Sequence, residues 1–404
     1  MNRLTITDLE HGVAIPCGTQ NRIPAAAAAL QRLGRRGMHY GWPGMTLTKD
    51  GDMLVSASER IHHVCPFGRL VTTRSKDRGR SWSEPQVIFD STTDDRDVAL
   101  NTMPDGTVLA TWFSSASWMD GKWFGAWKTT EMPVEWQAMA NRVTPDSLRA
   151  MARGWLRRSK DGGQTWEEEI YPTIIGQHAG PTSLADGSLV YLGPLRDETG
   201  KKVVATRSLD SGKTWQIIGE IPGISHTNPE HTRAATTINE NHVIETAPGS
   251  LLAAFRTHVA SPPDTPFDER LSAHTLHFTR SSDSGCTWSI PEDSGVPGYP
   301  PYLLRLQSGA ILCVFSNRCK PRSIRTIVSY DNGKSWDIKN THILRELDYP
   351  ADMGYPVAVE TAPGEVFCIY YAIPELNHPG YDNLDMNQWG ILSVRFKTRA
   401  PASY

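Results

Sequence analysis

Side chains able to perform nucleophilic and acid–base chemistry recur at one register position of this chain. The register is set by six glycines that each precede an apolar strand, and the position lies nine residues before each glycine. A phenol is a poor nucleophile at neutral pH, but a carboxylate within hydrogen-bond reach can take its proton. Carboxyl and imidazole groups can serve as general acids or bases. In chain order the position holds Trp42, Asp97, His178, Glu240, Pro300 and Tyr355.

A second register position supplies cations. It lies seven to nine residues after the glycine, where the following strand is expected to return to the same face. Arginine binds carboxylates through paired N–H donors, and acids beside arginines around a concave centre suit an anionic or polyhydroxylated ligand. We therefore expect His178 and this second set to line a binding pocket. The second set comprises Glu59, Arg60, Arg196, Arg256 and Arg318.

Two kinds of hairpin would position these side chains. The first turns at the six register glycines, as in G-S-L-L-A-A-F from Gly249. The second is an octapeptide, here called the Asp box, which reads S-Y-D-N-G-K-S-W from Ser329. Its aspartate can accept from N–H groups of its own turn, its glycine supplies φ > 0, and its tryptophan anchors the hairpin. The five box aspartates are therefore expected to be structural: Asp77, Asp161, Asp210, Asp283 and Asp331.

The alternation of these hairpins predicts the architecture. Six glycine hairpins, five of them followed by an Asp box, describe six four-stranded units. We predict an all-β fold, a single six-bladed β-propeller over residues 39–404. We expect the boxes between the second and third strands of each unit, on the face opposite the active site. Residues 1–38 are an N-terminal extension that supplies an edge strand or a cap. Residues 116–157 are an insertion in the second blade, where one or two helices would serve as a lid or a homo-oligomer contact.

Composition narrows the possible partners. A formal net charge of -3 over 404 residues leaves no basic stripe and argues against a nucleic-acid partner. No stretch approaches 18 apolar residues, so no membrane span is expected. The N-terminus has acids where a signal peptide would be apolar, which favours a cytoplasmic protein. The six cysteines lack C-x-x-C spacing, and we expect neither a metal nor a cofactor.

Two longer motifs connect these features with a known family. Asp boxes in a six-bladed propeller, with N-E-N-H-V-I-E-T-A-P-G-S-L-L-A-A-F-R (Asn239 to Arg256) and G-Y-P-V-A-V-E (Gly354 to Glu360), resemble the sialidase (neuraminidase) superfamily. The resemblance extends from about residue 38 to residue 397. It implies a tyrosine nucleophile polarised by a glutamate, three arginines on the substrate carboxylate, and an aspartate as acid/base.

The resemblance assigns roles to individual positions. Tyr355 matches the nucleophile, Glu240 its activating carboxylate, and Arg256 the second of the three arginines. For the third arginine Arg322 fits best, with Arg318 and Arg325 as rivals.

Two positions depart from the family pattern. Gly41 stands where the first arginine is implied, and the R-I-P at Arg22 to Pro24 lies too far upstream to replace it. His63 stands where the acid/base aspartate is implied, within R-I-H-H. Imidazole titrates near neutrality, so His62 or His63 could transfer the proton, and Asp97 is a further candidate.

Three functions are consistent with these residues. The first is an exo-glycoside hydrolase of the sialidase type that removes a terminal acidic sugar, sialic-acid-like or uronic, from a glycan. The second is a sialidase-fold polysaccharide lyase or uronate-linked glycosidase, with His63 or His178 and Tyr355 transferring protons while Arg256 neutralises a carboxylate. The third is a non-catalytic propeller that binds glycans or proteins, which the polar central position disfavours.

Overall fold

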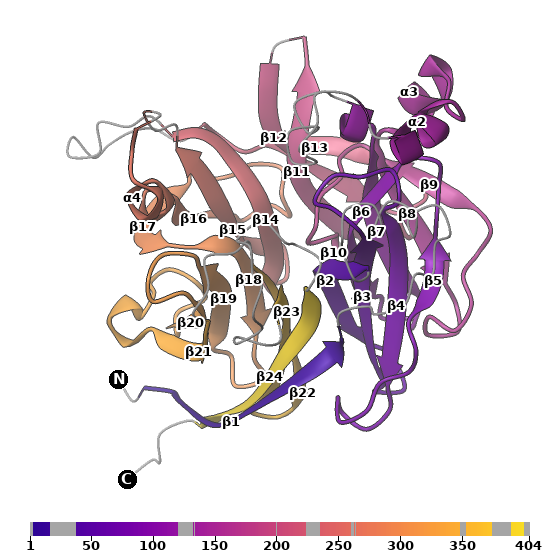
Figure 1. The fold of residues 1–404 in the computed structure, drawn as a ribbon. Helices are drawn as coiled ribbons and strands as arrows, with labels where there is room; N and C mark the ends of the chain where they lie inside the picture. The colour runs from indigo at the N-terminus through magenta and orange to yellow at the C-terminus, as the bar shows by residue number, and fades with distance from the viewer. Residues whose placement is uncertain are drawn as a thin grey trace.

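The computed structural model is built from six four-stranded antiparallel sheets. Their innermost strands contact one another in a closed ring, from β2 through β6, β10, β14, β18 and β22 back to β2 (Figure 1). The predicted all-β, six-bladed propeller is therefore confirmed. The R-I-P at Arg22 to Pro24 lies outside the described residues. Those residues are 3–16, 38–119, 132, 134–198, 200–223, 235–259, 262, 264–347, 353–373 and 389–399.

The first three sheets follow the chain from the inside of the ring outwards. The first contains β2 (His39–Leu47), β3 (Met53–Arg60), β4 (Arg69–Ser75) and β5 (Gln86–Phe89). The second contains β6 (Asp94–Thr102), β7 (Val108–Ser115), β8 (Gly154–Ser159) and β9 (Ile170–Thr173). The third contains β10 (Thr182–Ser183), β11 (Leu189–Asp197), β12 (Gly200–Ser208) and β13 (Gln216–Glu220).

The last three sheets repeat this order and close the ring. The fourth contains β14 (Ala235–Ala247), β15 (Ser250–Val259), β16 (Thr275–Ser281) and β17 (Glu292–Pro297). The fifth contains β18 (Tyr299–Arg305), β19 (Ile311–Asn317), β20 (Ser323–Ser329) and β21 (His342–Glu346). The sixth contains β22 (Gly354–Ala362), β23 (Glu365–Ala372), β24 (Gly390–Arg399) and, outermost, β1 (Thr5–Ile15).

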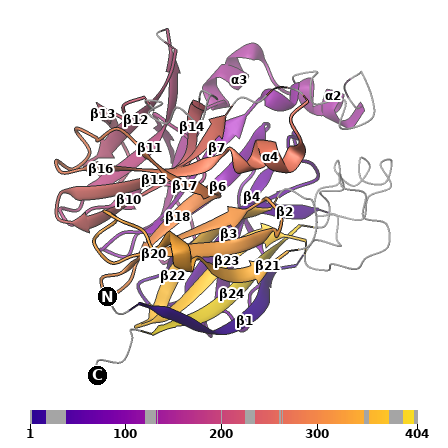
Figure 2. The same cartoon turned by 90° about the vertical axis from the view of Figure 1, so that its left-hand side faces the viewer.

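Strand β1 joins the two ends of the chain. It pairs antiparallel with β24, so that Thr5 lies opposite Arg399, and Figure 2 shows the two strands side by side. An unpaired β24 would present free N–H and C=O groups at its outer edge, and β1 covers them. The N-terminal segment thus supplies an edge strand to the sixth sheet.

The hydrophobic core fills the spaces between neighbouring sheets. Leu312 and Val314 on β19 pack against Val366 and Cys368 on β23, and all four are fully buried. Alternate residues of each strand point to opposite faces, so every inner sheet surface contributes to one of these layers. The layers hold the inner strands, and hence the central register position, in fixed relation.

The two predicted kinds of hairpin are present. The six register glycines lie at the turns between first and second strands and have φ between 75° and 96°. In the first Asp box, Ser75 Oγ donates to Asp77 Oδ1 (2.7 Å), which accepts from the backbone N–H of Ser81 (2.9 Å). The boxes join the third and fourth strands of the first five sheets, not the second and third as expected from the sequence.

The boxes nevertheless lie away from the central register position. Antiparallel strands place the 1–2 and 3–4 turns at the same end of a sheet. Accordingly, Arg74 Nη2 donates to Gly162 O of the neighbouring box at 2.5 Å, and Gly163 lies against Leu54, just after the first glycine turn. The residues nine positions before the glycines stand near the other ends of the inner strands.

The insertion in the second blade is helical, as predicted. It contains η1 (Ser117–Met119), α2 (Val134–Ala140) and α3 (Pro145–Met151), while residues 120–131 and 133 lie outside the described part. Helix α3 begins in T-P-D-S, where Thr144 Oγ1 accepts from Ser147 N at 3.1 Å. Two further elements were not anticipated: α4 (Phe267–Ser272), between β15 and β16, and η3 (Ile338–Asn340), between β20 and β21. Among the described residues, the helices are too short or too polar to cross a bilayer.

Candidate active site

The central register position coincides with a bulge in the inner strands. Trp42, Asp97, Glu240 and Tyr355 have φ of 50°, 55°, 38° and 51°, and each lies at a break in the pairing of its strand with the next. Left-handed backbone at such residues costs about 1–3 kcal/mol each, and bulges redirect side chains next to active sites. The repetition of this conformation in four blades explains why counting back from the glycines finds these residues.

Tyr355 and Glu240 meet although they are 115 residues apart. The Tyr355 hydroxyl donates a hydrogen bond to Glu240 Oε1. The other carboxylate oxygen, Oε2, is 2.5 Å from Arg256 Nη1. Tyr355 is 7% exposed, so the pair lies in a largely desolvated position. Three residues from the fourth and sixth blades therefore form one hydrogen-bonded unit.

The surroundings keep the proton on the phenol at rest. Burial, followed by the charges of Glu240 and Asp97, raises the pKa of Tyr355 well above its ordinary value, although Arg256 and Arg318 oppose this. Burial disfavours ionisation of Glu240, but Arg256, His178 and the Tyr355 hydroxyl outweigh it, and the pKa of Glu240 is lowered to about 2. Proton transfer to Glu240 therefore has to accompany attack by the phenol oxygen on a substrate.

Asp97 is the second carboxyl group at the centre. Its backbone N–H donates to Ser58 Oγ at 2.9 Å, which ties the bulge of β6 to the first blade. Burial raises the pKa of Asp97 to about 6, against the opposing charges of Arg96 and Arg60, and Glu240 adds to the rise. A carboxyl group with this pKa can carry a proton near neutrality and give it to a leaving group.

His178 packs on the nucleophile candidate. Its ring meets the ring of Tyr355 edge to face at 4.9 Å. Burial lowers the pKa of His178 to about 4, so the ring is neutral at physiological pH. The neighbouring Gln177 fixes the backbone here, since its Nε2 donates to Asn241 Oδ1 (2.8 Å) and its carbonyl accepts from Tyr191 OH (2.8 Å).

The three candidates for the third arginine, Arg318, Arg322 and Arg325, lie in different surroundings. Arg318 Nε donates to Met353 O at 3.1 Å, and its Nη2 lies 3.4 Å from Tyr371 OH. Its guanidinium lies over the ring of Tyr299, 4.9 Å from the centroid, and Arg256 lies over the same ring at 4.6 Å. Of the three candidate arginines, Arg318 is therefore the one whose guanidinium lies beside Arg256 and Tyr355.

The other two arginines of that stretch face elsewhere. Arg322 Nη2 pairs with Asp268 Oδ1 of α4 at 3.3 Å. Arg325 donates to Ser323 Oγ (2.7 Å) and to Pro321 O (3.0 Å). The sequence favoured Arg322 for the third arginine, and the structure does not bring Arg322 to Tyr355.

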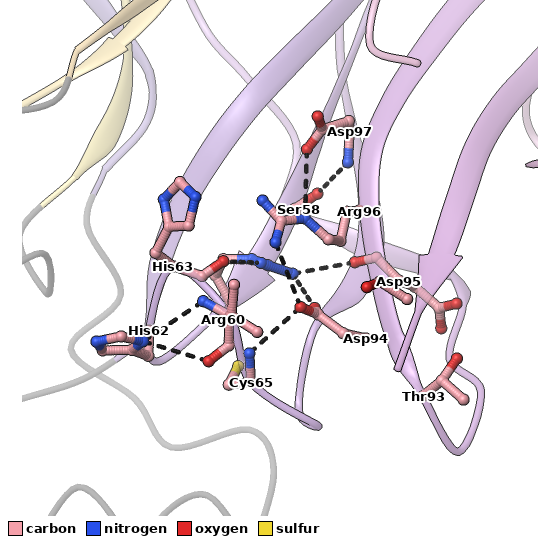
Figure 3. Close-up of polar contacts among 12 residues, drawn as sticks. Ser58, Arg60, His62, His63, Cys65, Thr93, Asp94, Asp95, Arg96 and Asp97 are labelled. Carbon is pink, nitrogen blue, oxygen red and sulfur yellow. Dashed lines mark hydrogen bonds and ion pairs between the residues drawn. The ribbon is translucent and has the colours of Figure 1, made fainter. Parts of the chain in front are cut away.

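Glu59 and Arg60 are enclosed beneath the centre. Glu59 accepts from Tyr40 OH at 2.8 Å and from Arg69 Nε at 2.6 Å, with no exposed surface. Arg60 is likewise fully buried and pairs with Asp94, as Figure 3 shows. Its guanidinium carbon is 4.8 Å from the centre of the Trp42 ring. Both residues support the site from below rather than lining an open pocket.

His63 lies at the edge of the same group. Its ring meets Trp42 edge to face at 5.1 Å, and its carbonyl accepts from Arg60 Nη1 at 2.8 Å. Burial and the charges of Arg96, Arg60, His62 and Arg318 hold the pKa of His63 well below its ordinary value, so it is neutral. His62 is turned away, with its Nδ1 3.2 Å from the Val64 carbonyl oxygen.

Helix α2 and η1 support the loop that carries His63. Trp118 and Trp136, both fully buried, pack with Val64 and Phe67 in one apolar cluster. The ring centroids of the two tryptophans are 6.2 Å apart in an edge-to-face arrangement. Part of the second-blade insertion thus stabilises an edge of the site.

Several residues of the site were not found from the sequence. Arg96 precedes Asp97, and its guanidinium carbon is 5.0 Å from the centre of the Trp42 ring. Asp94, with no exposed surface, pairs with both Arg60 and Arg96. The only signal in the sequence is their position next to a register residue. Gly41 contributes no cation, and the described side chains do not include that of Arg196.

The described residues contain no group of three or more His, Cys, Asp or Glu side chains that could hold a metal ion. The site is instead a set of carboxyl, phenol, imidazole and guanidinium groups among aromatic rings. Such a set can bind an anionic or hydroxylated ligand and exchange protons with it.

Comparison with known proteins supports the fold assignment. The sequence matches no protein-family model, and a search of curated proteins found no match. A protein of unknown function from Dyadobacter fermentans is 21% identical, with 98% of this chain and 99% of that chain covered and a TM-score of 0.66. A Hadza microbial sialidase is 19% identical, with 91% and 69% covered and a TM-score of 0.56.

A third similar structure is the intramolecular trans-sialidase from Ruminococcus gnavus, solved with oseltamivir carboxylate. It is 14% identical, with 91% of this chain and 96% of that chain covered and a TM-score of 0.57. At these identities the likeness concerns the backbone alone. The chain has the sialidase propeller fold.

Proposed function

We propose that this sialidase-fold chain is an exo-glycoside hydrolase that removes a terminal acidic sugar from a glycan. The observation that carries the proposal is the hydrogen bond from the Tyr355 hydroxyl to Glu240, whose other oxygen is 2.5 Å from Arg256. A buried phenol coupled to a carboxylate is an arrangement suited to covalent catalysis. Sialidases use a tyrosine nucleophile and are an exception to the two-carboxylate mechanism of most glycoside hydrolases.

The reaction follows from the placement of the groups. The Tyr355 oxygen attacks the anomeric carbon while its proton passes to Glu240. The glycosidic C–O bond breaks, and the leaving oxygen takes the proton of Asp97. Water then attacks the anomeric carbon, gives a proton to Asp97 and releases the phenol oxygen, which regains its proton from Glu240. In the net reaction, water cleaves the glycosidic bond and two hydroxyl groups form. Tyr355, Glu240 and Asp97 all return to their starting protonation states.

The charge of the site favours an acidic sugar. Four guanidinium groups belong to the site: those of Arg96, Arg256 and Arg318 adjoin the centre, and that of Arg60 lies beneath it. Three carboxyl groups face them, those of Asp94, Asp97 and Glu240. If all three carboxyl groups are ionised, the site has a net charge of +1. If Asp97 is protonated, the net charge is +2. Because buried charges require a partner, an anionic ligand group would complete the balance.

A lyase is the second candidate, and His178 supports it. The His178 ring is neutral, with a pKa of about 4, and lies 4.9 Å from the Tyr355 ring. Its Nδ1 has no hydrogen-bond partner among the described residues. A neutral imidazole beside a phenol could remove the proton next to a uronate carboxylate while Tyr355 protonates the leaving oxygen. This reaction produces an unsaturated sugar that absorbs ultraviolet light.

One screen separates these functions. Aryl glycosides of neuraminic acid, glucuronic acid and rhamnose are offered together with uronate polysaccharides, and aglycone release and ultraviolet absorbance are followed in parallel. Aglycone release from an acidic glycoside without new absorbance supports the hydrolase. New absorbance supports the lyase. Absence of both signals contradicts the two enzymatic proposals and leaves a binding propeller.

A further inference from the structure

A buried group of charges lies next to the proposed catalytic pair and takes no part in the steps above. Asp94, fully buried, pairs with Arg60, and its Oδ2 is 3.6 Å from Arg96 Nη1. Figure 3 shows these residues at the start of β6, with Asp97 next to Arg96. One carboxylate between two guanidinium groups leaves a positive charge that it cannot neutralise alone.

The adjacent Asp95 does not supply the missing negative charge. Its Oδ1 accepts from Ser114 Oγ (2.6 Å) and Ser91 Oγ (3.0 Å), and its Oδ2 accepts from Ser91 N (2.7 Å). These contacts turn its carboxyl group toward the serines. Burial also raises the pKa of Asp95 to about 7, so at and below neutral pH much of it is uncharged.

The Arg96 guanidinium is held in place but incompletely satisfied. It lies against the rings of Trp42 and Phe113, with its guanidinium carbon 5.0 Å and 5.7 Å from their centroids. Arg96 is 8% exposed, and its buried Nε has no hydrogen-bond partner among the described residues. The nearest carboxylate oxygen to this atom is Asp97 Oδ1, at 3.8 Å. Buried donors in native proteins are normally paired, so an orphaned guanidinium N–H calls for an acceptor.

Arg96 lies close to the catalytic pair. Burial lowers the pKa of Arg96, but the charges of Asp94, Asp97 and Tyr355 outweigh it, so the pKa is raised overall. Arg256 and Arg318 reach the same tyrosine from the fourth and fifth blades, but each already donates to a protein acceptor at 2.5 Å and 3.1 Å respectively. The Nε atoms of Arg60 and Arg256 also lack a partner among the described residues, but both guanidinium groups donate through other nitrogens. Arg96, on the second blade, makes no side-chain hydrogen bond to a described residue, and its nearest carboxylate oxygens are 3.6 and 3.8 Å away.

We propose that Arg96 binds the acidic group of the ligand and determines the preference for a charged over a neutral sugar, with Asp94 as the positioning residue that orients it. The inference rests on the proposed function only for the ligand class, an acidic sugar. A planar guanidinium fork with one edge on Asp94 can offer its remaining N–H groups to a carboxylate. A lysine at this position would keep the charge and lose the fork.

The test measures binding without turnover. In a Tyr355→Phe background, calorimetry gives the Kd of two matched pairs: aryl glucuronide with aryl glucoside, and aryl neuraminate with its carboxyl-reduced alcohol. The readout is the ratio of the neutral Kd to the acidic Kd, which a general loosening of the fold would not change. Arg158→Gln is the control, because Arg158 is 9% exposed and pairs with Glu167 at 2.9 Å on β8 of the same blade.

We expect Arg96→Gln to lower this ratio about 10- to 100-fold for the pair that binds, since a charge-assisted hydrogen bond is lost. Arg96→Lys and Asp94→Asn should give smaller decreases, and Arg158→Gln should leave the ratio unchanged. Should Asp94→Asn fail to fold, the two Arg96 variants decide alone. An unchanged ratio in Arg96→Gln with an intact melting curve would overturn the proposal, as would failure of both acidic sugars to bind.

The two proposals fail in different ways. Hydrolysis of acidic aryl glycosides by the wild-type protein, with an unchanged binding ratio in Arg96→Gln, removes the role of Arg96 and keeps the hydrolase. Binding that depends on Arg96, without aglycone release by the wild-type protein, removes the hydrolase and keeps the role of Arg96.

Discussion

Replacing Tyr355 by phenylalanine tests the covalent mechanism with the least disturbance of the fold. The substitution removes the hydroxyl that donates to Glu240. The ring contacts with His178 (4.9 Å), Tyr371 (5.6 Å) and Trp42 (6.4 Å) remain available. Glu240 keeps its ion pair with Arg256. The protein should therefore fold, while no oxygen remains in position to attack the anomeric carbon.

The size of the effect follows from the loss of one reaction route. Removing a covalent nucleophile should lower kcat on an aryl glycoside by roughly four powers of ten, or about 5.4 kcal/mol of transition-state stabilisation. Glu240→Gln cannot accept the phenol proton and also loses the charge that pairs with Arg256 at 2.5 Å, so a similar loss is expected. Because the two groups act as one unit, the double variant should be little slower than either single variant. Independent contributions would multiply to roughly eight powers of ten.

The assay is aglycone release at saturating substrate, with thermal melting measured on every variant. Tyr371→Phe is the matched control, because Tyr371 is fully buried, lies beside Tyr355 and contacts Arg318 at 3.4 Å through its hydroxyl. It should retain activity within about tenfold, because the hydrogen bond that it loses, from the Arg318 guanidinium, is long and therefore weak. Turnover by Tyr355→Phe close to the wild-type value would refute the covalent tyrosine and make His63 and His178 the leading candidates.

Three further predictions concern the aspartates. Asp97 has a pKa of about 6 and acts as an acid, so kcat/KM should fall about tenfold per pH unit above pH 6. Asp97→Asn should abolish this fall at high pH and slow the hydrolysis of alkyl glycosides far more than that of aryl glycosides. Equal losses on both substrates would contradict the role of Asp97. Asp95 has a pKa of about 7 in the fold against 3.8 when unperturbed, so its contribution to stability is full below pH 4 and is lost as pH rises from 4 to 7. The full loss amounts to roughly 4 kcal/mol, of which about 2.5 kcal/mol falls between pH 5 and pH 8. Urea unfolding at these two pH values should show that difference in the wild type but not in Asp95→Asn. Asp161 accepts from Ser159 Oγ (2.8 Å) and Thr165 N (2.9 Å); Asp161→Ala should cost about 1–3 kcal/mol of stability without altering kcat, and lost activity at an unchanged Tm would count against a structural box.

The repeats allowed the fold to be predicted because propeller blades repeat local signals. Each glycine with positive φ marks the turn between first and second strands, and each Asp box closes its own turn with its own side chain. Both signals depend on residues close in sequence, so they can be interpreted without tertiary contacts. Counting from the glycines also brought Tyr355 and Glu240 to the same level, since the inner strands share a bulge at that position.

What the sequence could not determine is which side chains face the centre from the other strands and loops. Arg318 and Arg322 are four residues apart, but only Arg318 lies by Tyr299 and Tyr371, while Arg322 pairs with α4, a helix absent from the prediction. Glu59 satisfies the same spacing rule as Arg256 and is enclosed by Tyr40 and Arg69.

The role of Arg96 likewise depends on the tertiary structure. Its surroundings come from the first blade, through Trp42, from Asp94 on its own strand, and from Tyr355 on the sixth blade. Backbone register is a local property that turn residues specify. The partner of a buried charge depends on which blade packs beside it. Packing removes the charge from water, and only then does the charge need a partner in the protein.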